Sequence, residues 1–275
     1  MKDLTQIKEE KRRFKFGNNW KQYLKLLNQQ KINFSKECLL GFLDEKTLKG
    51  KKFLDVGSGS GLSSLVAKIA GAEVYSFDYD EESVACSQYL KHKYFPDDPK
   101  WKIAQGSALD SKYLASLGKF DIVYSWGVLH HTGEMDQALE LIEQNVAENG
   151  KLFISLYNDQ GLTSKFWIAI KKAYVNSPYL IQQIILFLCY LRLWGPTTIK
   201  DFIKFRPFYT WKNYSQNRGM SPQQDVKDWV GGYPFEVSKP EKIIHFFIKK
   251  GYNLQKLKTC GGGKGCNEFL FVKNK

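Results

Sequence analysis

The chain has 275 residues, of which 43% are hydrophobic, enough for one large α/β domain with a packed core. This composition excludes a disordered chain. Met1 is followed by charged residues without an apolar leader, and the five cysteines are widely spaced, so we expect a cytoplasmic protein with free thiols.

The net charge of +13 is unevenly distributed along the chain. Residues 1–52 carry 14 Lys/Arg against 6 Asp/Glu, residues 53–158 carry 8 against 15, and residues 159–275 carry 19 against 7. Basic flanks of this kind can attract an anionic partner such as a phosphorylated metabolite, an acidic glycan or RNA. Solvated lysines that bind nothing explain the same pattern.

The first predicted element is an amphipathic helix over Lys21–Gln29, preceded by an aromatic segment that ends in Trp20. We assign residues 1–50 to an N-terminal helical region. Residues 51–158 follow as an α/β core, because short β-branched or aromatic runs alternate there with stretches of helical period. The predicted strands are Lys52–Val56, Glu73–Asp78, Trp101–Gln105, Phe120–Ser125 and Gly150–Tyr157, and the helices are Leu62–Ala70, Glu81–Lys93 and Glu134–Ala147.

The alternation stops over residues 159–236, which we predict to be a helical insertion. Helical stretches are expected over Thr163–Tyr174 and Tyr179–Leu193. The apolar run Tyr179–Trp194 is shorter than the roughly 20 residues that span a bilayer. We therefore expect a buried helix with no transmembrane segment, and contact with lipid is the alternative.

Residues 237–275 complete the core with a helix over Lys239–Lys250 and two strands, Leu254–Thr259 and Glu268–Lys273. No helix separates these strands, so they should pair antiparallel. The sequence therefore predicts a Rossmann-like α/β fold: a seven-stranded, mostly parallel sheet with one antiparallel strand, plus a helical insertion that acts as a lid.

A glycine-rich turn, Gly57-Ser58-Gly59-Ser60-Gly61, follows the first predicted strand and leads into a helix. Such a turn lets a nucleotide approach the backbone. Leu62 stands where the dinucleotide fingerprint would require a third glycine, which disfavours NAD. Asp78 closes the second strand, 21 residues after Gly57, where a carboxylate can accept both hydroxyls of a ribose.

The segment Asp55-Val56-Gly57-Ser58-Gly59-Ser60-Gly61 resembles the first motif of class I S-adenosylmethionine-dependent methyltransferases. The resemblance implies that the turn holds the methionine part of S-adenosyl-L-methionine and that the acidic residue fixes the turn. It also implies an N-terminal flap over the cofactor. The predicted cofactor residues are Asp55, Gly57, Ser58, Gly59, Gly61, Asp78, Tyr79, Ser107, Ala108, Trp126 and Trp20.

The fourth strand is followed by Val128-Leu129-His130-His131, which resembles the V-L-H-H segment of small-molecule methyltransferases, including quinol O-methylases. A histidine whose pKa is near neutral can remove the proton of an acceptor hydroxyl. His130 and His131 are the candidate bases, with His130 preferred as the one that faces the acceptor. A purely structural role for both histidines is the alternative.

Loops after the fifth and sixth strands should lie over the cofactor's methyl group and bind the acceptor. We expect a small molecule or glycan, with O-methylation, and an RNA acceptor is the alternative. No metal is expected, because no histidine or second cysteine pair lies near Cys260 and Cys266. The candidate acceptor-binding residues are Tyr157, Asn158, Arg218, Asp225, Tyr233, Lys264 and Asn267.

Overall fold

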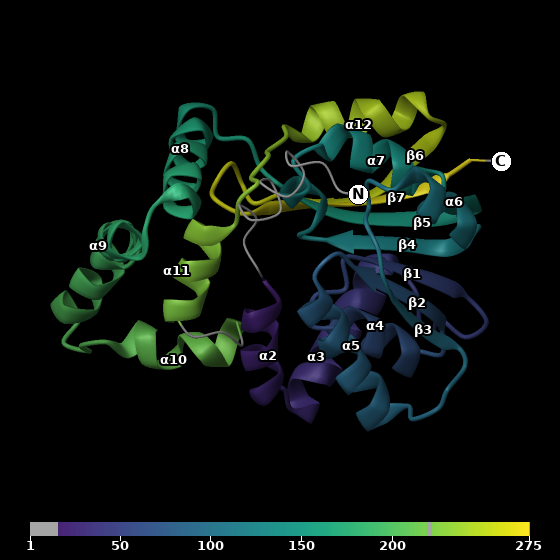
Figure 1. Ribbon diagram of the computed structural model, residues 1–275, viewed down its shortest axis with the longest axis horizontal. Helices are drawn as coiled ribbons and strands as arrows, with labels where there is room; N and C mark the ends of the chain where they lie inside the picture. Colours follow the sequence, from purple (N-terminus) through teal and green to yellow (C-terminus); the bar gives the residue numbers. More distant parts are fainter. Residues whose placement is uncertain (1–15, 219–221, 275) are drawn as a thin grey trace.

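The computed structural model describes residues 16–218 and 222–274 and contains one seven-stranded sheet flanked by helices (Figure 1). The order of its strands is β3-β2-β1-β4-β5-β7-β6. Their bounds are β1 Lys52–Val56, β2 Glu73–Asp78, β3 Trp101–Gln105, β4 Phe120–Trp126, β5 Val146–Tyr157, β6 Tyr252–Lys258 and β7 Cys266–Lys273.

Strands β1 to β5 pair in parallel, whereas β7 pairs antiparallel with both β5 and β6. This confirms the predicted sheet with one reversed strand. Strand β5 begins at Val146, not at Gly150, because Val146 pairs with Phe120 across an irregularity in the ladder. The helix predicted over Glu134–Ala147 ends at Glu143 for the same reason, because residues 146 and 147 belong to the strand.

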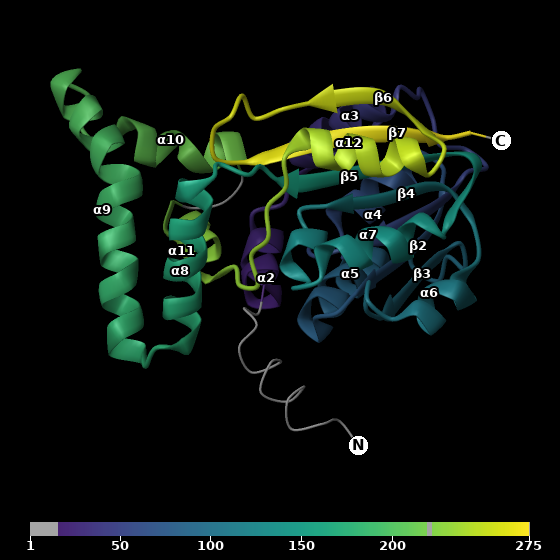
Figure 2. The ribbon, with the colours of Figure 1, turned by 90° about the horizontal axis from the view of Figure 1, so that it is seen from above.

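Helices cover both faces of the sheet and bury one apolar cluster on each side (Figures 1 and 2). On one face lie α6 Ser111–Leu117, α7 Met135–Glu143 and α12 Pro240–Lys249; on the other lie α3 Gln29–Leu43, α4 Leu62–Ile69 and α5 Glu81–Tyr94. The sequence analysis did not predict α3 or α6. It placed the first helix at Lys21–Gln29, whereas α2 spans Gly17–Lys25 and the chain turns before α3.

The insertion forms a helical group beside the sheet, made of α8 Leu162–Asn176, α9 Tyr179–Ile203, α10 Tyr209–Arg218 and α11 Pro222–Gly231. It has its own apolar core around Trp167, Trp194 and Phe235. Its two ends leave the sheet side by side, because Asn158 bridges Ser238 and the Ser238 amide donates to the Tyr157 carbonyl at 2.9 Å. The group is therefore anchored at the carboxyl end of β5.

Helix α9 continues ten residues beyond the predicted end, through Pro196. Proline inside a helix leaves the preceding turn without one hydrogen bond. Thr198 lies directly after this point: its hydroxyl donates to the Trp194 carbonyl at 2.9 Å and accepts from the Trp211 indole at 2.9 Å. These contacts tie the second half of α9 to α10.

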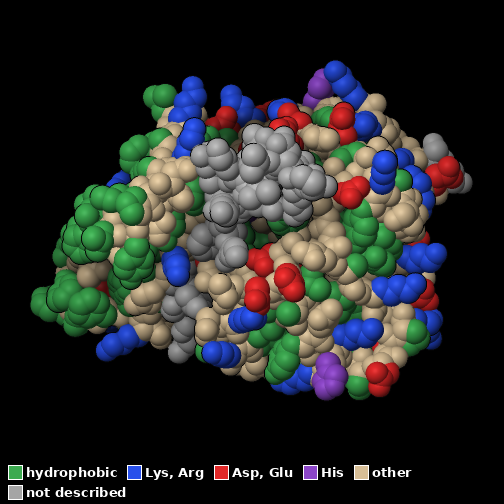
Figure 3. All heavy atoms as spheres, viewed as in Figure 1, with side chains coloured by type: hydrophobic (Ala, Val, Ile, Leu, Met, Phe, Trp, Pro, Cys, Tyr) green, Lys and Arg blue, Asp and Glu red, His purple; other side chains and the backbone are tan. Residues whose placement is uncertain are grey.

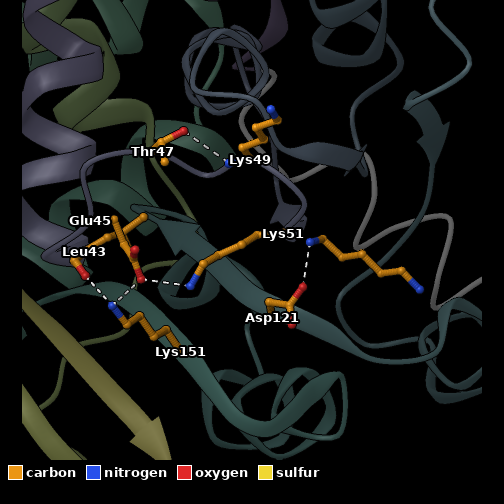
Figure 4. Close-up of polar contacts among 8 residues, drawn as sticks. Leu43, Glu45, Thr47, Lys49, Lys51, Asp121 and Lys151 are labelled. Atoms are coloured by element: carbon orange, nitrogen blue, oxygen red, sulfur yellow. Dashed lines mark hydrogen bonds and ion pairs between the residues drawn. The ribbon is translucent and has the colours of Figure 1, made fainter.

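A half-buried lysine links strand β5 to the end of α3 (Figure 4). The Lys151 ammonium donates to the Leu43 carbonyl at 2.6 Å and to a Glu45 carboxylate oxygen at 2.8 Å, and Lys51 donates to the same oxygen at 2.9 Å. Burial would raise the pKa of Glu45, but the two lysines hold it below its usual value. The carboxylate is therefore ionised and paired at neutral pH.

We predict that Lys151→Ala lowers the free energy of unfolding by about 1–3 kcal/mol at pH 7, because it leaves Leu43 and Glu45 without their main donor. Because the pKa of Glu45 is lowered in the folded protein, this stability is lost as pH falls through the folded pKa. The difference in unfolding free energy between wild type and Lys151→Ala should therefore narrow in acid. Urea denaturation at two pH values measures both effects. Lys52→Ala, at an exposed side chain, is the control, and an equal loss there would contradict the assignment.

Candidate active site

The carboxyl ends of the parallel strands open into a cavity of about 1670 Å³. This is larger than the roughly 300–1,000 Å³ of common ligand sites. Its wall runs from the glycine turn after β1, past the segment after β4, to the insertion and the loop before β7. The cavity therefore has room for a nucleoside-sized cofactor together with a second ligand.

The glycine turn bends because Gly57, Gly59 and Gly61 all adopt positive φ angles, of 78°, 53° and 79°. A Cβ on Gly59 would lie 3.1 Å from two atoms of the Trp20 indole, and Gly59 lines the cavity. A residue that carries a Cβ atom is strained at these positive φ angles. The turn thus keeps a strip of bare backbone facing the cavity.

Asp78 fixes the turn from the end of β2. One of its carboxylate oxygens accepts the Gly59 amide at 2.8 Å and the other accepts the Asp80 amide at 2.9 Å. Burial raises the pKa of Asp78 to about 6, although these backbone donors lower it. A carboxylate has about four acceptor sites, so these backbone contacts leave capacity to accept from a ribose hydroxyl.

Asp55 and Gly61 lie at the base of the turn. The Asp55 carboxylate is buried and accepts the Ser64 hydroxyl at 2.5 Å, and burial raises its pKa to about 7. Gly61 precedes α4, and a Cβ there would lie 2.7 Å from the Ser87 hydroxyl on α5. Gly61 is absent from the described cavity wall, and the close approach of α5 accounts for a glycine at this position.

Helix α2 closes the site from above the turn. Trp20 lies on the cavity wall next to Gly59, and the Gly17 amide donates to Asp80 at 2.9 Å. Lys21 pairs with Glu82, while Asn19 donates to Asp228 of α11. The helix therefore connects the core to the insertion directly across the cavity. Residues 1–15 of the predicted N-terminal region lie outside the described residues.

Most of the remaining predicted cofactor residues border the same cavity. Tyr79 and Trp126 are exposed there, Ala108 is buried, and the Ser107 hydroxyl accepts the Leu109 amide at 3.1 Å. The predicted cofactor residues on the wall are Asp55, Gly57, Ser58, Gly59, Asp78, Tyr79, Ser107, Ala108, Trp126 and Trp20.

The two histidines follow β4 in a short 3₁₀ helix, Leu129–His131, where successive side chains point in different directions. His130 is fully buried: its Nδ1 accepts the Tyr157 amide at 3.2 Å, and its ring centroid lies 4.0 Å from that of Tyr157. Burial, with smaller contributions from His131 and Lys171, lowers the pKa of His130 well below its usual value. His130 is therefore neutral, and it lies behind the wall.

His131 lines the cavity and contacts Phe16, with ring centroids 5.1 Å apart. Its Nδ1 lies 2.6 Å from the Pro234 carbonyl oxygen. Because a carbonyl only accepts, Nδ1 carries a proton, and in the neutral ring the lone pair is on Nε2. The sequence favoured His130 as the residue that faces the acceptor, whereas in the structure the histidine that lines the cavity is His131.

The predicted acceptor-binding residues divide into two groups. Tyr157, Asp225, Tyr233 and Lys264 line the large cavity. Asn267 is buried instead, where its amide donates to the Asn158 side chain at 3.0 Å and its oxygen accepts the Cys260 amide at 3.1 Å. These two asparagines hold the loop before β7, away from the wall. The Arg218 side chain lies outside the described residues.

The insertion supplies wall residues that the sequence analysis did not identify, including Leu193, Trp194, Tyr214 and Trp229. Behind them, the buried Lys171 donates to the Trp229 carbonyl, and its ammonium lies 4.4 Å from the centroid of the Trp229 ring. Burial lowers the pKa of Lys171 to about 7. These aromatic residues fall at no regular spacing, so only the tertiary fold brings them together.

The described wall carries far more acid than base. Among the residues that the structure describes, its only Lys or Arg side chains are Lys258 and Lys264. Its carboxylates are Asp55, Asp78, Asp80, Glu81, Glu82, Asp225, Asp228 and Glu268. S-adenosyl-L-methionine carries a sulfonium and an ammonium, so an acidic cradle with a bare glycine turn and a ribose-accepting carboxylate fits this cofactor.

Comparison with known proteins identifies the family. The methyltransferase-domain family matches residues 28–194, which is more than half of the chain and includes the turn, Asp78 and both histidines. The chain belongs to the class I S-adenosylmethionine-dependent methyltransferases. Its cofactor is S-adenosyl-L-methionine.

Individual relatives are distant from this methyltransferase. A ribosomal protein L11 methyltransferase of Helicobacter hepaticus is 30% identical over 49% of this chain and 39% of its own. A ubiquinone biosynthesis O-methyltransferase of Pelagibacter ubique is 26% identical over 58% of each chain. The match thus spans less than two thirds of either relative.

Among solved structures, the fold is similar to that of the magnesium protoporphyrin IX methyltransferase of Synechocystis, crystallised with bound SAH. The TM-score is 0.51 at 18% identity, over 90% of this chain and 83% of the other. At this identity the similarity concerns the fold.

We predict that Gly59→Ala weakens binding of S-adenosylhomocysteine at least about tenfold, because a Cβ there is strained and faces both Trp20 and the cavity. Isothermal titration calorimetry measures the affinity. Gly41→Ala on α3, where a Cβ would meet nothing within 4 Å, is the matched control. Equal affinities of the two variants would contradict a cofactor lying against the turn.

Cofactor affinity should also depend on pH through Asp78. Its pKa of about 6 means that the carboxylate is mostly protonated at pH 5 and ionised at pH 7. Ribose hydroxyls donate better to the ionised form, so affinity for S-adenosylhomocysteine should rise by up to about tenfold over this interval. Asp78→Asn should weaken binding and flatten the profile. If the affinity of Asp78→Asn for S-adenosylhomocysteine changed with pH as it does in wild type, another group would control the pH dependence.

Proposed function

We propose that this methyltransferase transfers the methyl group of S-adenosyl-L-methionine to a hydroxyl group of a small aromatic molecule. The observation that carries the proposal is the single cavity that borders the glycine turn, His131 and the aromatic wall of the insertion. A cofactor on the turn and an acceptor beneath the insertion would share one space. Transfer requires this proximity, because the two reacting groups must meet near van der Waals contact and in line.

The acceptor half of the cavity favours a flat, uncharged molecule. Its wall is mainly aromatic, with Tyr157, Trp194, Tyr214, Trp229 and Tyr233. Aromatic rings pack well against a phenol or a similar ring. The insertion contributes two carboxylates to the wall, Asp225 and Asp228, and no Lys or Arg among its described residues, which gives no support to the earlier expectation of acidic ligands. Nothing in this part of the described lining specifically favours a glycan as the methyl acceptor.

His131 is the proposed general base. The cofactor supplies an electrophilic methyl group when bound. With the cofactor held by the turn and Asp78, Nε2 of His131 would accept the proton that the acceptor hydroxyl gives up on methylation. The Pro234 carbonyl holds the tautomer that this step needs. His130 serves as a positioning residue, since its contact with the Tyr157 amide orients the wall.

Similarity in sequence lends support to transfer to oxygen. The Pelagibacter ubique relative is by name an O-methyltransferase of ubiquinone biosynthesis. The Helicobacter hepaticus relative is by name a methyltransferase for a ribosomal protein, but it aligns over a shorter part of both chains. An RNA acceptor would call for a basic trough around the site, and the carboxylate-rich wall does not favour it.

We predict that His131→Asn lowers kcat by about 10²-fold or more on a phenolic acceptor, because it removes the proton-accepting nitrogen. S-adenosylhomocysteine release over a panel of phenols and catechols finds the acceptor and then measures the loss. Affinity for S-adenosylhomocysteine, measured by calorimetry, should stay within about threefold of wild type.

His130→Asn provides the comparison. His130→Asn should lower kcat less than His131→Asn does, because His130 is neutral and lies behind the cavity wall. Full activity of His131→Asn on every acceptor that wild type uses would exclude a histidine base. A large loss of cofactor affinity in that variant would assign His131 to the cofactor site instead.

A further inference from the structure

One side of helix α9 is apolar and exposed. Large side chains lie along it at helical spacing, and most are more than half exposed, for example Leu180 at 75% and Phe187 at 61%. We call this set the α9 stripe: Leu180, Ile184, Phe187, Leu188, Leu191 and Ile199. Proteins rarely leave so many large apolar groups together in water unless another surface covers them.

The stripe continues into the connection between α9 and α10. Here Phe202, Ile203, Phe205 and Phe208 are exposed, with Phe205 at 94%. We call residues 202–209 the aromatic tip. Figure 3 shows hydrophobic side chains gathered at the outer edge of the molecule, over the region that α9 occupies in Figure 1. In Figure 2, the end of α9 projects away from the sheet.

Every exposed charge on this segment is positive. Over residues 179–209 the charged residues are Arg192, Lys200, Asp201, Lys204 and Arg206, and only Asp201 is buried. The Asp201 carboxylate accepts both the amide and the hydroxyl of Thr210 at 2.8 Å, so its charge is directed inward. An apolar surface edged by Lys and Arg is complementary to a bilayer that contains anionic lipids.

We propose that the α9 stripe and the aromatic tip dock on the surface of an anionic lipid bilayer. A second copy of the chain fits this surface less well, because its own copy of the segment offers no exposed anionic group to pair with the four cations, whereas an anionic bilayer does. No described helix is long and apolar enough to cross a membrane. The helix therefore lies along the interface, with its apolar side chains among the acyl chains and its cations at the headgroups.

The opposite side of the same helix lines the cavity with Leu193, Trp194 and Thr197. A docked bilayer would thus lie about one helix diameter, roughly 10 Å, from the acceptor half of the site. An acceptor dissolved in the bilayer would have a short path to His131. This last step rests on the proposed function, whereas docking itself does not.

Sedimentation with vesicles tests the docking. Wild-type protein should pellet with mixed phosphatidylglycerol–phosphatidylcholine vesicles and much less with pure phosphatidylcholine. Phe187→Glu should lower the partition coefficient by about tenfold or more, since a charge replaces an inserted ring. Phe34→Glu on α3, where the phenylalanine is 65% exposed, is the matched control and should bind as wild type. Circular dichroism checks that both variants fold.

Paired substitution of Lys200 and Lys204 by Gln should weaken binding to the anionic vesicles by about tenfold or more and leave binding to neutral vesicles unchanged. His131→Asn should bind vesicles as wild type, so that a failure of docking is distinct from a failure of catalysis. Wild-type protein that stays in the supernatant would overturn the proposal. An equal loss of vesicle binding in Phe34→Glu would also overturn it. A third contrary result would be a wild-type protein that does not bind vesicles and forms a dimer, which Phe187→Glu converts to a monomer.

Discussion

The hydrogen bond from the Gly59 amide to the Asp78 carboxylate joins the end of β2 to the glycine turn after β1. Asp78 also accepts the Asp80 amide, and Asp80 in turn accepts the amide of Gly17, which begins α2. One chain of carboxylates thus positions the turn, the start of α5 and the helix that covers the site. Because Asp78 is half-buried, these contacts are costly to leave unmade, and they fix the bare backbone that a nucleoside can approach.

A second constraint positions the acceptor side. The insertion leaves and re-enters the sheet at one point, Asn158 beside Ser238, and packs around its own core. It reaches the other side of the cavity through the contact of Asn19 with Asp228. Near its C-terminal end the insertion also contacts the segment after β4, where the Pro234 carbonyl meets His131 and Glu236 accepts the Met135 amide. Because these contacts come from α2 and from the segment after β4, the acceptor side of the cavity is positioned by the same elements that border the cofactor turn.

The sequence was most informative where local chemistry decides the structure. Buried β-branched strands and the glycines of positive φ predict the sheet and the turn, because the strand period and the backbone conformation are local properties. Helix α9 extends past Pro196, where the Thr198 hydroxyl donates to the Trp194 carbonyl of the same helix and accepts from the Trp211 indole of α10. His130 and His131 are adjacent and chemically identical, and only the 3₁₀ geometry after β4 decides which one faces the cavity. The acidic wall likewise comes from several distant segments and cannot be predicted from any one of them.

The central claim is that one cavity holds the cofactor on the glycine turn and the acceptor against His131. A crystal structure with S-adenosylhomocysteine tests it most directly. The account predicts ribose hydroxyls on Asp78, the homocysteine part along Gly57 to Gly59, and the sulfur facing the part of the wall formed by His131 and Tyr157. A ligand whose sulfur points away from His131, or one bound outside this cavity, would contradict it.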